Sequence, residues 1–206
     1  LMTDVQANEF LDQAGSDPVT RAIRVRQLQE DLRRLQEVLD IWSEDETAMK
    51  ALGGDLNEVH ECRQIVAFEI EDCFRRLVFL PDDFQRPVYG LRLDGMQFGK
   101  FPTLPTGLNF DHVRQLSLRD MQLDNDAAYF LKAFRQVESL ELDRNQLTLL
   151  PEVISHMPNL KRLSLANNRI QLTEHSLVKL ARLYSLQSLN LSGNPLGATV
   201  DVSRLF

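Results

Sequence analysis

Apolar residues in the second half of the chain recur in one fixed pattern. The eleven residues from Leu160 read LKRLSLANNRI, with leucine at the first, fourth and sixth positions and asparagine at the ninth. The same order begins at Val137 and Leu186 and, with methionine at the ninth position, at Val88 and Val113. Successive starting positions are 25, 24, 23 and 26 residues apart. Five copies in one register indicate a repeating structural unit.

The pattern L-x-x-L-x-L-x-x-N-x-L with a period of roughly 20–29 residues is that of a leucine-rich repeat. Each x-Leu-x-Leu-x stretch predicts a short strand whose leucines point into the core and whose neighbours point outward. Stacked strands would form a parallel sheet on the concave face of a solenoid. The predicted fold class is therefore α/β, with a leucine-rich-repeat solenoid of about five repeats over residues 81–206 and an all-α cap over residues 1–80.

The ninth position follows each strand where the chain turns inward. Asn145, Asn168 and Asn194 occupy it in the last three copies, and an amide can satisfy backbone groups that a buried turn leaves unpaired. Met96 and Met121 occupy it in the first two copies. Because a methionine cannot make these hydrogen bonds, we expect the first two turns to be looser or differently bonded.

The segments that return the chain to the next strand predict alternating structures. Two prolines in residues 101–105 favour an extended return, and residues 149–158 favour an extended or 3₁₀ return. Residues 124–134 predict a helix that buries Phe130, Leu131 and Phe134. The fourth return predicts a helix capped by Thr173, with one apolar face formed by Leu177, Leu180 and Leu183.

The N-terminal third predicts helices. A capping box at residues 3–6 would open a short helix that ends at Gly15. A longer helix should start at Pro18, with an apolar stripe of Val25, Leu28, Leu32, Leu35, Leu39 and Trp42. Ser43 and Glu46 form a capping box for a shorter helix, which Gly53-Gly54 would end.

A last helix is expected from about Asp55 to about Val78, since Pro81 bars its extension. Its apolar stripe is Val59, Cys62, Val66, Ile70, Cys73 and Leu77. The two cysteines are about 16 Å apart along such a helix, too far to bridge each other, so we interpret both as small core residues. The helices should cover the open end of the repeats, with junction contacts from Leu77, Phe79, Leu80 and Phe84.

Four arginines lie off the first long stripe: Arg21, Arg24, Arg33 and Arg34. They could bind an acidic partner, or they could form a solvated face whose charges pair with neighbours such as Glu30 and Glu37. The second interpretation is favoured, because charged helix faces are usually exposed surface.

The charge balance narrows the class of partner. The chain carries a net charge of −7 with a pI of about 5.1, so its field would repel nucleic acid and anionic membranes. No apolar run approaches the roughly 18 residues of a membrane span, and no signal peptide is visible. Two cysteines fit a reducing compartment.

Catalytic and metal-binding motifs are not found. His60-Glu61 begins a zinc-protease motif, but Gln64 stands where the second histidine is needed. His112, His156 and His175 are placed on turns or convex segments of different repeats. The acceptor triplet at residues 190–192 is discounted for glycosylation because Leu191 is a core leucine. We predict no catalytic residue, no metal and no cofactor in this chain.

Outward strand residues and their flanking turns form the predicted partner-binding surface. Its residues are Arg92, Asp94, Ser117, Arg119, Asp120, Glu141, Asp143, Arg144, Ser164, Asn167, Asn190 and Ser192. The alternative is a solvated sheet face on which opposite charges pair across strands. Concave faces of repeat proteins are commonly binding surfaces, so we predict a protein-interaction module.

Three segments resemble one bacterial family. YGLRLDGMQFGKFPTLPTGLNFDHVRQLSLRDMQL, LTLLPEVISHMPNLKRLSLANNRIQLT and LNLSGNPLG are similar to repeats of large Gram-negative toxin- or effector-like proteins that end in a novel E3 ubiquitin ligase (NEL) domain. The helical block of residues 18–80 resembles the segment that precedes the repeats there. The resemblance implies that the repeats select a protein substrate, such as a host protein, and restrain the ligase. It also implies a bacterial protein that is secreted or delivered to host cytoplasm.

The ligase cysteine of that family lies in a C-x-D motif within a later domain. Cys62 is followed by Arg-Gln and Cys73 by Phe-Arg, so the catalytic residue does not carry over to this chain. The last repeat reaches Phe206 without a polar closing element, and we expect the native protein to continue. Alternative functions are a structural spacer, a repeat binder unrelated to ubiquitin transfer, or an enzyme. The oligomeric state is left open.

Overall fold

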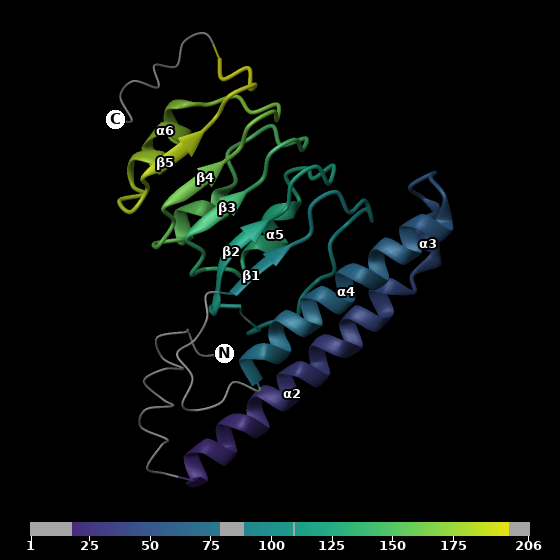
Figure 1. Ribbon diagram of the computed structural model, residues 1–206. Helices are drawn as coiled ribbons and strands as arrows, with labels where there is room; N and C mark the ends of the chain where they lie inside the picture. Colours follow the sequence, from purple (N-terminus) through teal and green to yellow (C-terminus); the bar gives the residue numbers. More distant parts are fainter. Residues whose placement is uncertain (1–17, 79–88, 109, 198–206) are drawn as a thin grey trace.

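Five parallel strands stand side by side in chain order in the computed structural model, which describes residues 18–78, 89–108 and 110–197 (Figure 1). They are β1 (Tyr89–Arg92), β2 (Val113–Ser117), β3 (Ser139–Glu141), β4 (Arg162–Ser164) and β5 (Ser188–Asn190). Equivalent leucines are partners across successive strands: Leu91, Leu116, Leu140, Leu163 and Leu189. This register confirms the predicted repeat alignment within an α/β repeat fold. Val88, where the first copy starts, lies outside the described residues.

The inward leucines of the strands form the core of the repeats. Leu140 and Leu142 are fully buried, whereas Glu141 between them is half-buried and faces the other side of the sheet. In the fifth repeat Leu189 and Leu191 are only half-buried. The reason is that, in the part of the chain that the structure describes, β5 has a strand neighbour on one side only.

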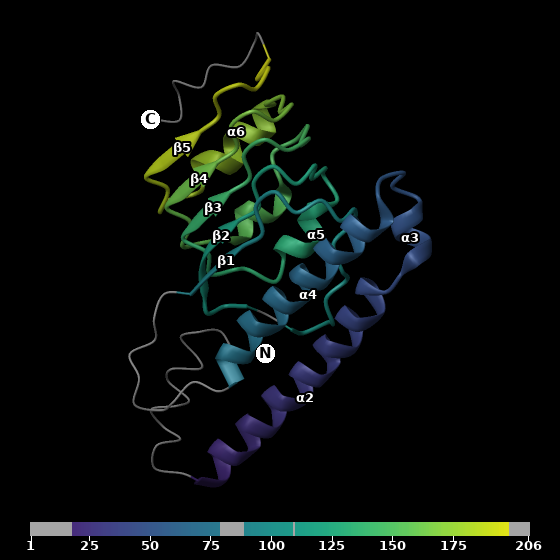
Figure 2. The same cartoon turned by 45° about the vertical axis from the view of Figure 1, so that its right-hand side comes forward.

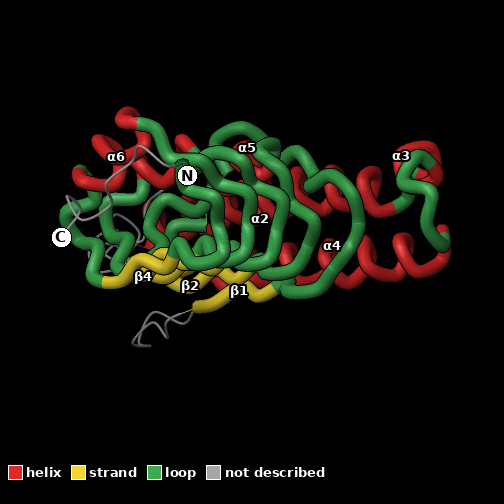
Figure 3. Tube along the Cα trace, turned by 90° about the horizontal axis from the view of Figure 1, so that it is seen from above, coloured by secondary structure: helices red, strands yellow, loops and turns green. Residues whose placement is uncertain are grey.

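The return segments lie on one side of the sheet (Figure 3), and we call this the return side. The outward strand residues face the other side, because they alternate with the buried leucines along each strand. They contain α5 (Ala127–Leu131), the 3₁₀ helix η1 (Glu152–His156) and α6 (Glu174–Ala181), while residues 101–105 are not helical. Thr173 caps α6 in a reciprocal capping box with Ser176, as the sequence predicts for the start of this helix. α5 is shorter than predicted, because turns closed by hydrogen bonds between residues three positions apart flank it. One such bond runs from the Phe134 N–H to the Leu131 carbonyl.

Each asparagine of the pattern joins its own turn to the turn before it. The Asn145 amide nitrogen donates to the carbonyls of Leu142 (2.9 Å) and Leu118 (2.8 Å). Its oxygen accepts from the backbone N–H groups of Met121 (2.9 Å) and Leu123 (3.1 Å). Asn168 and Asn194 repeat the two carbonyl contacts in the fourth and fifth repeats, and the oxygen of each accepts one backbone N–H, from Leu147 and Ile170 respectively. The predicted role of these asparagines is confirmed.

The turn at Met121 is differently bonded, as one half of the expectation states, but it is not loose. The Met121 side chain is buried, and its backbone N–H is bonded by Asn145 from the next repeat. Around Met96 the expectation holds better, because the next repeat offers Met121 rather than an amide, and the Met96 N–H donates to the Leu93 carbonyl instead. We call this series of asparagine side-chain hydrogen bonds the amide ladder. Each asparagine in it bonds the turn of the preceding repeat as well as the turn of its own repeat.

Two antiparallel helices, α2 (Pro18–Ser43) and α4 (Leu56–Val78), precede the repeats, and the short α3 (Glu46–Lys50) connects them (Figure 1). Gln36 bonds Glu71 at 2.7 Å and His60 contacts Glu44 at 3.0 Å along the seam. The predicted stripes hold these helices together, because the following side chains are buried: Leu28, Leu32, Leu35, Leu39, Val66, Ile70 and Cys73. The helix expected over residues 3–15 lies outside the described residues.

The cap of α3 differs from the predicted one. Asp45 is the N-cap and accepts from the Ala48 N–H at 3.1 Å. Ser43 is instead the last residue of α2, where its hydroxyl donates to the Asp40 carbonyl at 3.2 Å. A serine hydroxyl can bond a carbonyl one turn back, and here that contact keeps it within α2. α3 ends at Lys50, ahead of Gly53 with its φ of +72°.

Two of the arginines singled out on α2, Arg33 and Arg24, lie in opposite environments. Arg33 is exposed and pairs with Glu30 and Glu37, as predicted. Those contacts hold the pKa of Glu30 below its ordinary value, chiefly through the hydrogen bond from Arg33. Arg24 is buried rather than solvated, because it precedes Leu28 by four residues and so lies on the apolar stripe itself. Its assignment to the exposed face is wrong.

The helices and the repeats share one continuous buried cluster, and α4 packs against β1 (Figure 2). Phe74 on α4 contacts Phe110, with ring centroids 5.6 Å apart, and Phe110 stacks on Phe134 at 4.9 Å. Arg63, only 2% exposed, donates to the carbonyls of Trp42 (2.7 Å) and Phe98 (2.9 Å). The helices thus cover the first repeat.

The predicted junction was incomplete. Phe79, Leu80 and Phe84 lie outside the described residues, as does the side chain of Leu77. His112, assigned to an external segment, is buried at the junction, and its Nε2 lies 2.8 Å from the Cys73 carbonyl oxygen. It directly precedes β2, which places it beneath α4.

Candidate functional site

The sheet register gathers the predicted binding residues into two rows. The first row follows the strand pairing and consists of Arg92, Ser117, Glu141, Ser164 and Asn190. The second row lies two residues later and consists of Asp94, Arg119, Asp143, Ala166 and Ser192. We call these rows, with the turns that follow them, the open sheet face. Tertiary structure therefore brings the predicted residues together on one surface.

Two aspartates of the second row hold neighbouring repeats together. Asp94 accepts from the Ser117 hydroxyl at 2.7 Å and from the Arg119 N–H at 2.8 Å. Asp143 makes the same contacts between the third and fourth repeats. It accepts from the Ser164 hydroxyl at 2.5 Å and from the Ala166 N–H at 3.0 Å. These four side chains are committed to internal hydrogen bonds, so their main role is structural.

Charges on the open sheet face also pair with one another. Arg92 contacts Asp94 at 3.1 Å, and Arg119 lies 3.6 Å from Asp143 and 4.0 Å from Glu141. The Arg92–Asp94 pair lies within one repeat, whereas the Arg119 contacts cross to the next repeat, as the alternative of cross-strand pairing predicts. Together these pairs neutralise much of the local charge, so recognition here would depend on the remaining polar groups.

Three predicted binding residues have a positive φ, and each lies in the turn that follows a strand. Asp120, Arg144 and Asn167 have φ values of 53°, 57° and 56°, and glycine stands at the equivalent position in the first and fifth repeats. All three side chains are exposed. A non-glycine residue in this region is strained, most clearly for Arg144. Glycine is favoured in the fifth repeat, because Gly193 has a φ of +72° and a Cβ there would displace the side-chain oxygen of Asn167, which would lie only 2.2 Å away.

Sequence analysis missed one row of the same face. This row lies two residues before the first row in each strand, and its members pair across successive strands: Gln115, Ser139, Arg162 and Ser188. All but Ser139 are exposed. The signal was present, because strand alternation puts these residues on the same face as the first row.

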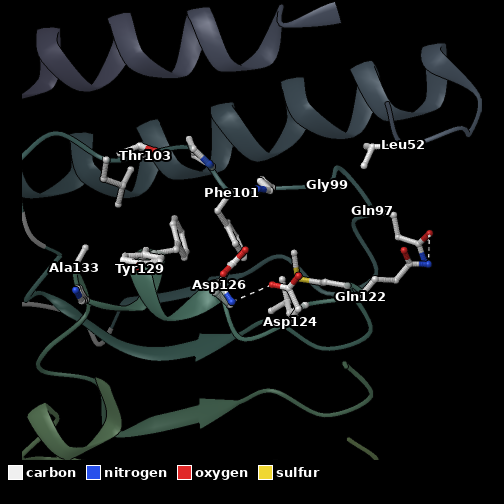
Figure 4. Close-up of a pocket in the computed structure, with 18 of the residues that line it drawn as sticks. Leu52, Gln97, Gly99, Phe101, Thr103, Gln122, Asp124, Asp126, Tyr129 and Ala133 are labelled. Atoms are coloured by element: carbon white, nitrogen blue, oxygen red, sulfur yellow. Dashed lines mark hydrogen bonds between the residues drawn. The ribbon is translucent and has the colours of Figure 1, made fainter. Parts of the chain in front are cut away.

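A groove on the return side was missed entirely. It has a volume of about 1300 Å³ and lies between residues 99–108, α5 and the loop after α3 (Figure 4). Its floor includes Phe101 and Phe130, whose rings stack with centroids 4.1 Å apart at 11°. Leu52 and Tyr129 lie at its edges and are 46% and 75% exposed. No local pattern could reveal it, because three separate segments of the chain build it.

One wall of the groove is tied to the helices. The Trp42 indole donates to the Lys100 carbonyl at 2.9 Å, and Arg34 donates to the Thr106 carbonyl at 3.0 Å. Pro102 and Pro105 restrict the backbone between these two points. The helical region therefore does more than cover the first repeat, because it positions this wall.

Titratable groups do not assemble a reactive centre in the described ranges. Burial raises the pKa of the Cys73 thiol to about 12, so this thiol is a poor nucleophile. Cys62 and Cys73 are both free. Among the described residues, no group of three or more histidine, cysteine, aspartate or glutamate side chains could hold a metal ion, and no helix is long and apolar enough to cross a membrane.

Comparison with known proteins identifies the repeats. Residues 111–170 and 135–196 match the family model described as "Leucine rich repeat". No curated protein matches the chain. Among solved structures, the tropomodulin C-terminal domain from Caenorhabditis elegans is similar, with a TM-score of 0.38 and 12% identity, covering 86% of this chain and 87% of that chain. The chain thus contains a leucine-rich-repeat region that includes the four copies starting at residues 113, 137, 160 and 186.

Proposed function

We propose that this chain is a protein-interaction module that holds a protein partner on its open sheet face. Leucine-rich repeats generally mediate contacts between proteins, which supports the class. The single observation that carries the choice of face is its set of aligned, exposed polar side chains that the core does not use: Gln115, Arg144, Arg162, Asn167 and Asn190.

The face combines a rigid base with available polar groups. Asp94 and Asp143 hold the base through hydrogen bonds between repeats, so the exposed side chains are presented at fixed spacings. Arg144 and Arg162 are the best candidates for anchors, because arginine is enriched among residues that dominate binding energy. No exposed apolar patch is required for such a mixed polar contact.

Photo-crosslinking from defined positions tests this proposal. A photoreactive residue would be placed at Gln115 or Arg162 on the open sheet face, and at Arg182 or Glu174 on the return side as matched exposed controls. We expect one protein to be captured from the first two positions and not from the controls. The double substitution Arg144→Asn and Arg162→Ser should then weaken its binding at least tenfold, since asparagine tolerates a positive φ.

A structural spacer makes the opposite prediction. In that case the four positions would crosslink the same proteins equally, and the double variant, confirmed as folded by circular dichroism, would behave as wild type. Turnover of any substrate by residues 1–206 would instead favour an enzyme.

We also propose that the module is the substrate-recognition arm of a larger bacterial NEL-type ubiquitin ligase, secreted or delivered into a host cell. Support comes from the resemblance of the repeat segments and of the helices that precede them. The test is the reading frame beyond Phe206 in the source gene. A helical domain with a C-x-D cysteine, active in ubiquitin transfer, is expected, whereas an unrelated domain or a stop codon would leave a generic repeat binder.

A further inference from the structure

The groove on the return side lies across the sheet from the open sheet face, and the interaction proposed above makes no use of it. We propose that it is a second binding site, which takes an extended peptide segment of a partner protein. The segment carries a large apolar side chain between a basic residue and an acidic residue.

The groove is built before any ligand arrives. Trp42 and Arg34 hold the backbone of residues 100–106 at two points, and Arg63 holds the Phe98 carbonyl just before them. α5 forms the facing wall and is anchored in the core by Phe130, which is 3% exposed. A preformed site spares the ligand the cost of ordering the protein, so a short segment could bind measurably.

Its size and lining suit a peptide better than a small molecule. The volume of about 1300 Å³ exceeds the roughly 300–1,000 Å³ of typical small-molecule pockets. Figure 4 places Phe101 between Leu52 and Tyr129, which lie toward opposite ends of the groove. Single exposed apolar residues are ordinary, but here two of them border a shared aromatic floor. Such a surface would accept a large apolar side chain in its centre.

Charge at the two ends of α5 sets the order of the ligand. Asp126 stands at the N-terminal end of α5 and makes no capping hydrogen bond through its side chain, and Lys132 stands at the C-terminal end. Both line the groove and both are exposed. Arg135 is already engaged, because it pairs at 3.1 Å with Asp111, which is 1% exposed.

Asp124 also lines the groove and is exposed, and it adds to the negative charge at the Asp126 end. Lys100 is exposed on the facing wall. The Lys132 ammonium lies 5.1 Å from the centroid of the Tyr129 ring, so along α5 a ligand would meet negative charge at Asp126 and positive charge at Lys132 beside Tyr129.

The distance between these ends predicts a spacing. Asp126 and Lys132 are six positions apart at the two ends of the five-residue α5, which corresponds to about 9 Å at 1.5 Å per residue. An extended peptide covers the same distance in about three residues at 3.3 Å each. The basic and acidic residues of the ligand should therefore be about three positions apart, with the large apolar residue between them.

Selection from a random twelve-residue peptide library displayed on phage, using the full 206-residue chain as the target, is the first test. We expect enriched peptides with an aromatic or aliphatic residue between opposite charges at that spacing. A synthetic labelled copy of an enriched peptide would then be titrated by fluorescence polarisation. Tyr129→Ser should weaken it at least tenfold, as the loss of an aromatic anchor does. Tyr184→Ser is the matched control, since Tyr184 is 91% exposed and does not line the groove.

Charge reversal tests the orientation independently. Asp126→Lys should weaken the peptide about threefold, within the range of an exposed ion pair, and a peptide whose basic residue is changed to glutamate should recover that loss. Lys132→Glu should respond to the opposite peptide change. Glu174→Lys, an exposed acidic residue at the start of α6, should alter neither peptide.

Three outcomes would overturn the proposal. These are no enrichment on the wild-type chain, enriched peptides that Tyr129→Ser binds as well as wild type, or charge reversals that no matched peptide rescues. Peptides lost by Arg144→Asn with Arg162→Ser but retained by the groove variants would place the site on the open sheet face instead. That fourth result would also overturn the proposal, because it excludes the groove as the peptide site, and it would leave the function proposed above unaffected.

Discussion

The chain contains two kinds of junction, one between successive repeats and one between the helices and the first repeat. Between repeats the same contacts recur, with an asparagine bonding its own turn and the one before it. At the helical junction every contact occurs once: Arg63 between two carbonyls, and Phe74 against Phe110. The repeated junction uses a small set of polar positions, whereas the single junction uses large buried side chains.

This difference predicts where stability is concentrated. A repeat array is stabilised by nearest-neighbour interfaces, so damage to one asparagine should remain close to that turn. The helical junction has no second copy of its contacts. Its loss should expose the first repeat and the groove wall together, because the same helices hold both.

The largest effect is expected at the centre of the aromatic junction. Phe110 is fully buried and contacts both Phe74 and Phe134. Phe110→Ala should lower the free energy of unfolding by about 4 kcal/mol, through lost burial and the cavity left behind. Chemical denaturation would measure this loss, and hydrogen exchange should rise in α4 and β1 more than in α6. Phe68→Ala, at a residue 64% exposed on α4, is the control. A loss below about 1 kcal/mol for Phe110→Ala would contradict an aromatic junction.

The next effect concerns the buried guanidinium. Arg63 bonds two carbonyls and lies 4.7 Å from the Trp42 ring centroid. Arg63→Met keeps much of the side-chain volume but leaves both carbonyls unpaired, and it should cost about 3 kcal/mol. Burial also lowers the pKa of Arg63, which shows that its charge carries a desolvation cost. Equal stability of Arg63→Met and wild type would mean that this cost cancels the hydrogen bonds. Arg33→Met on the exposed face should leave the unfolding midpoint unchanged.

A smaller and more local effect is expected inside the array. Asn168 is buried, accepts from the Leu147 N–H and donates to the carbonyls of Leu142 and Leu165. Asn168→Ala should cost about 1–3 kcal/mol by leaving these groups unpaired. Asn194→Ala should cost less, because Asn194 is half-buried in the last described repeat. Thermal melts of both variants would measure the difference, and an unchanged melt for Asn168→Ala would mean that the amide ladder adds no stability.

The smallest effect is an ion pair between the third and fourth repeats. Lys161 lies 2.8 Å from Glu138 and, mainly through that hydrogen bond, holds the pKa of Glu138 below its ordinary value. A carboxyl with a lowered folded-state pKa adds stability above its unfolded pKa and loses it as the pH falls through the folded pKa. Both side chains are partly exposed, so the contribution should be only a few tenths of a kcal/mol. Denaturation at pH 7 and pH 3 should show this acid-dependent loss in wild type and less of it in Lys161→Met.

Predictions from the sequence succeeded where several copies supported them. The strands, the asparagine turns and the capped helix after Thr173 all lie where the pattern places them. Each is a local feature. Five copies fixed the register of the strands and three copies that of the asparagine turns, whereas the helix after Thr173 occurs once and was identified by its cap and its apolar face. Other single-copy inferences were weaker, since Ser43 closes α2 rather than opening α3, and Arg24 and His112 are buried.

The candidate site was only partly readable from the chain. Alternation along the strands identified the outward residues, but it could not separate Asp94 and Asp143, which bond the next repeat, from exposed residues such as Arg144 and Asn167. That distinction depends on which atoms lie across the sheet. The groove depends still more on distant contacts, because its walls come from the loop after α3, the first return segment and α5.

The sequence by itself determined the repeating unit, the order of strands and the inward leucines, because these follow from the period of side chains along the backbone. Tertiary structure alone decided which polar side chains are structural, which remain exposed, and that the helices position one wall of a groove. The physical reason is that hydrogen bonding and burial depend on neighbours across space. Trp42 meets Lys100 only after the helices have packed onto the first repeat.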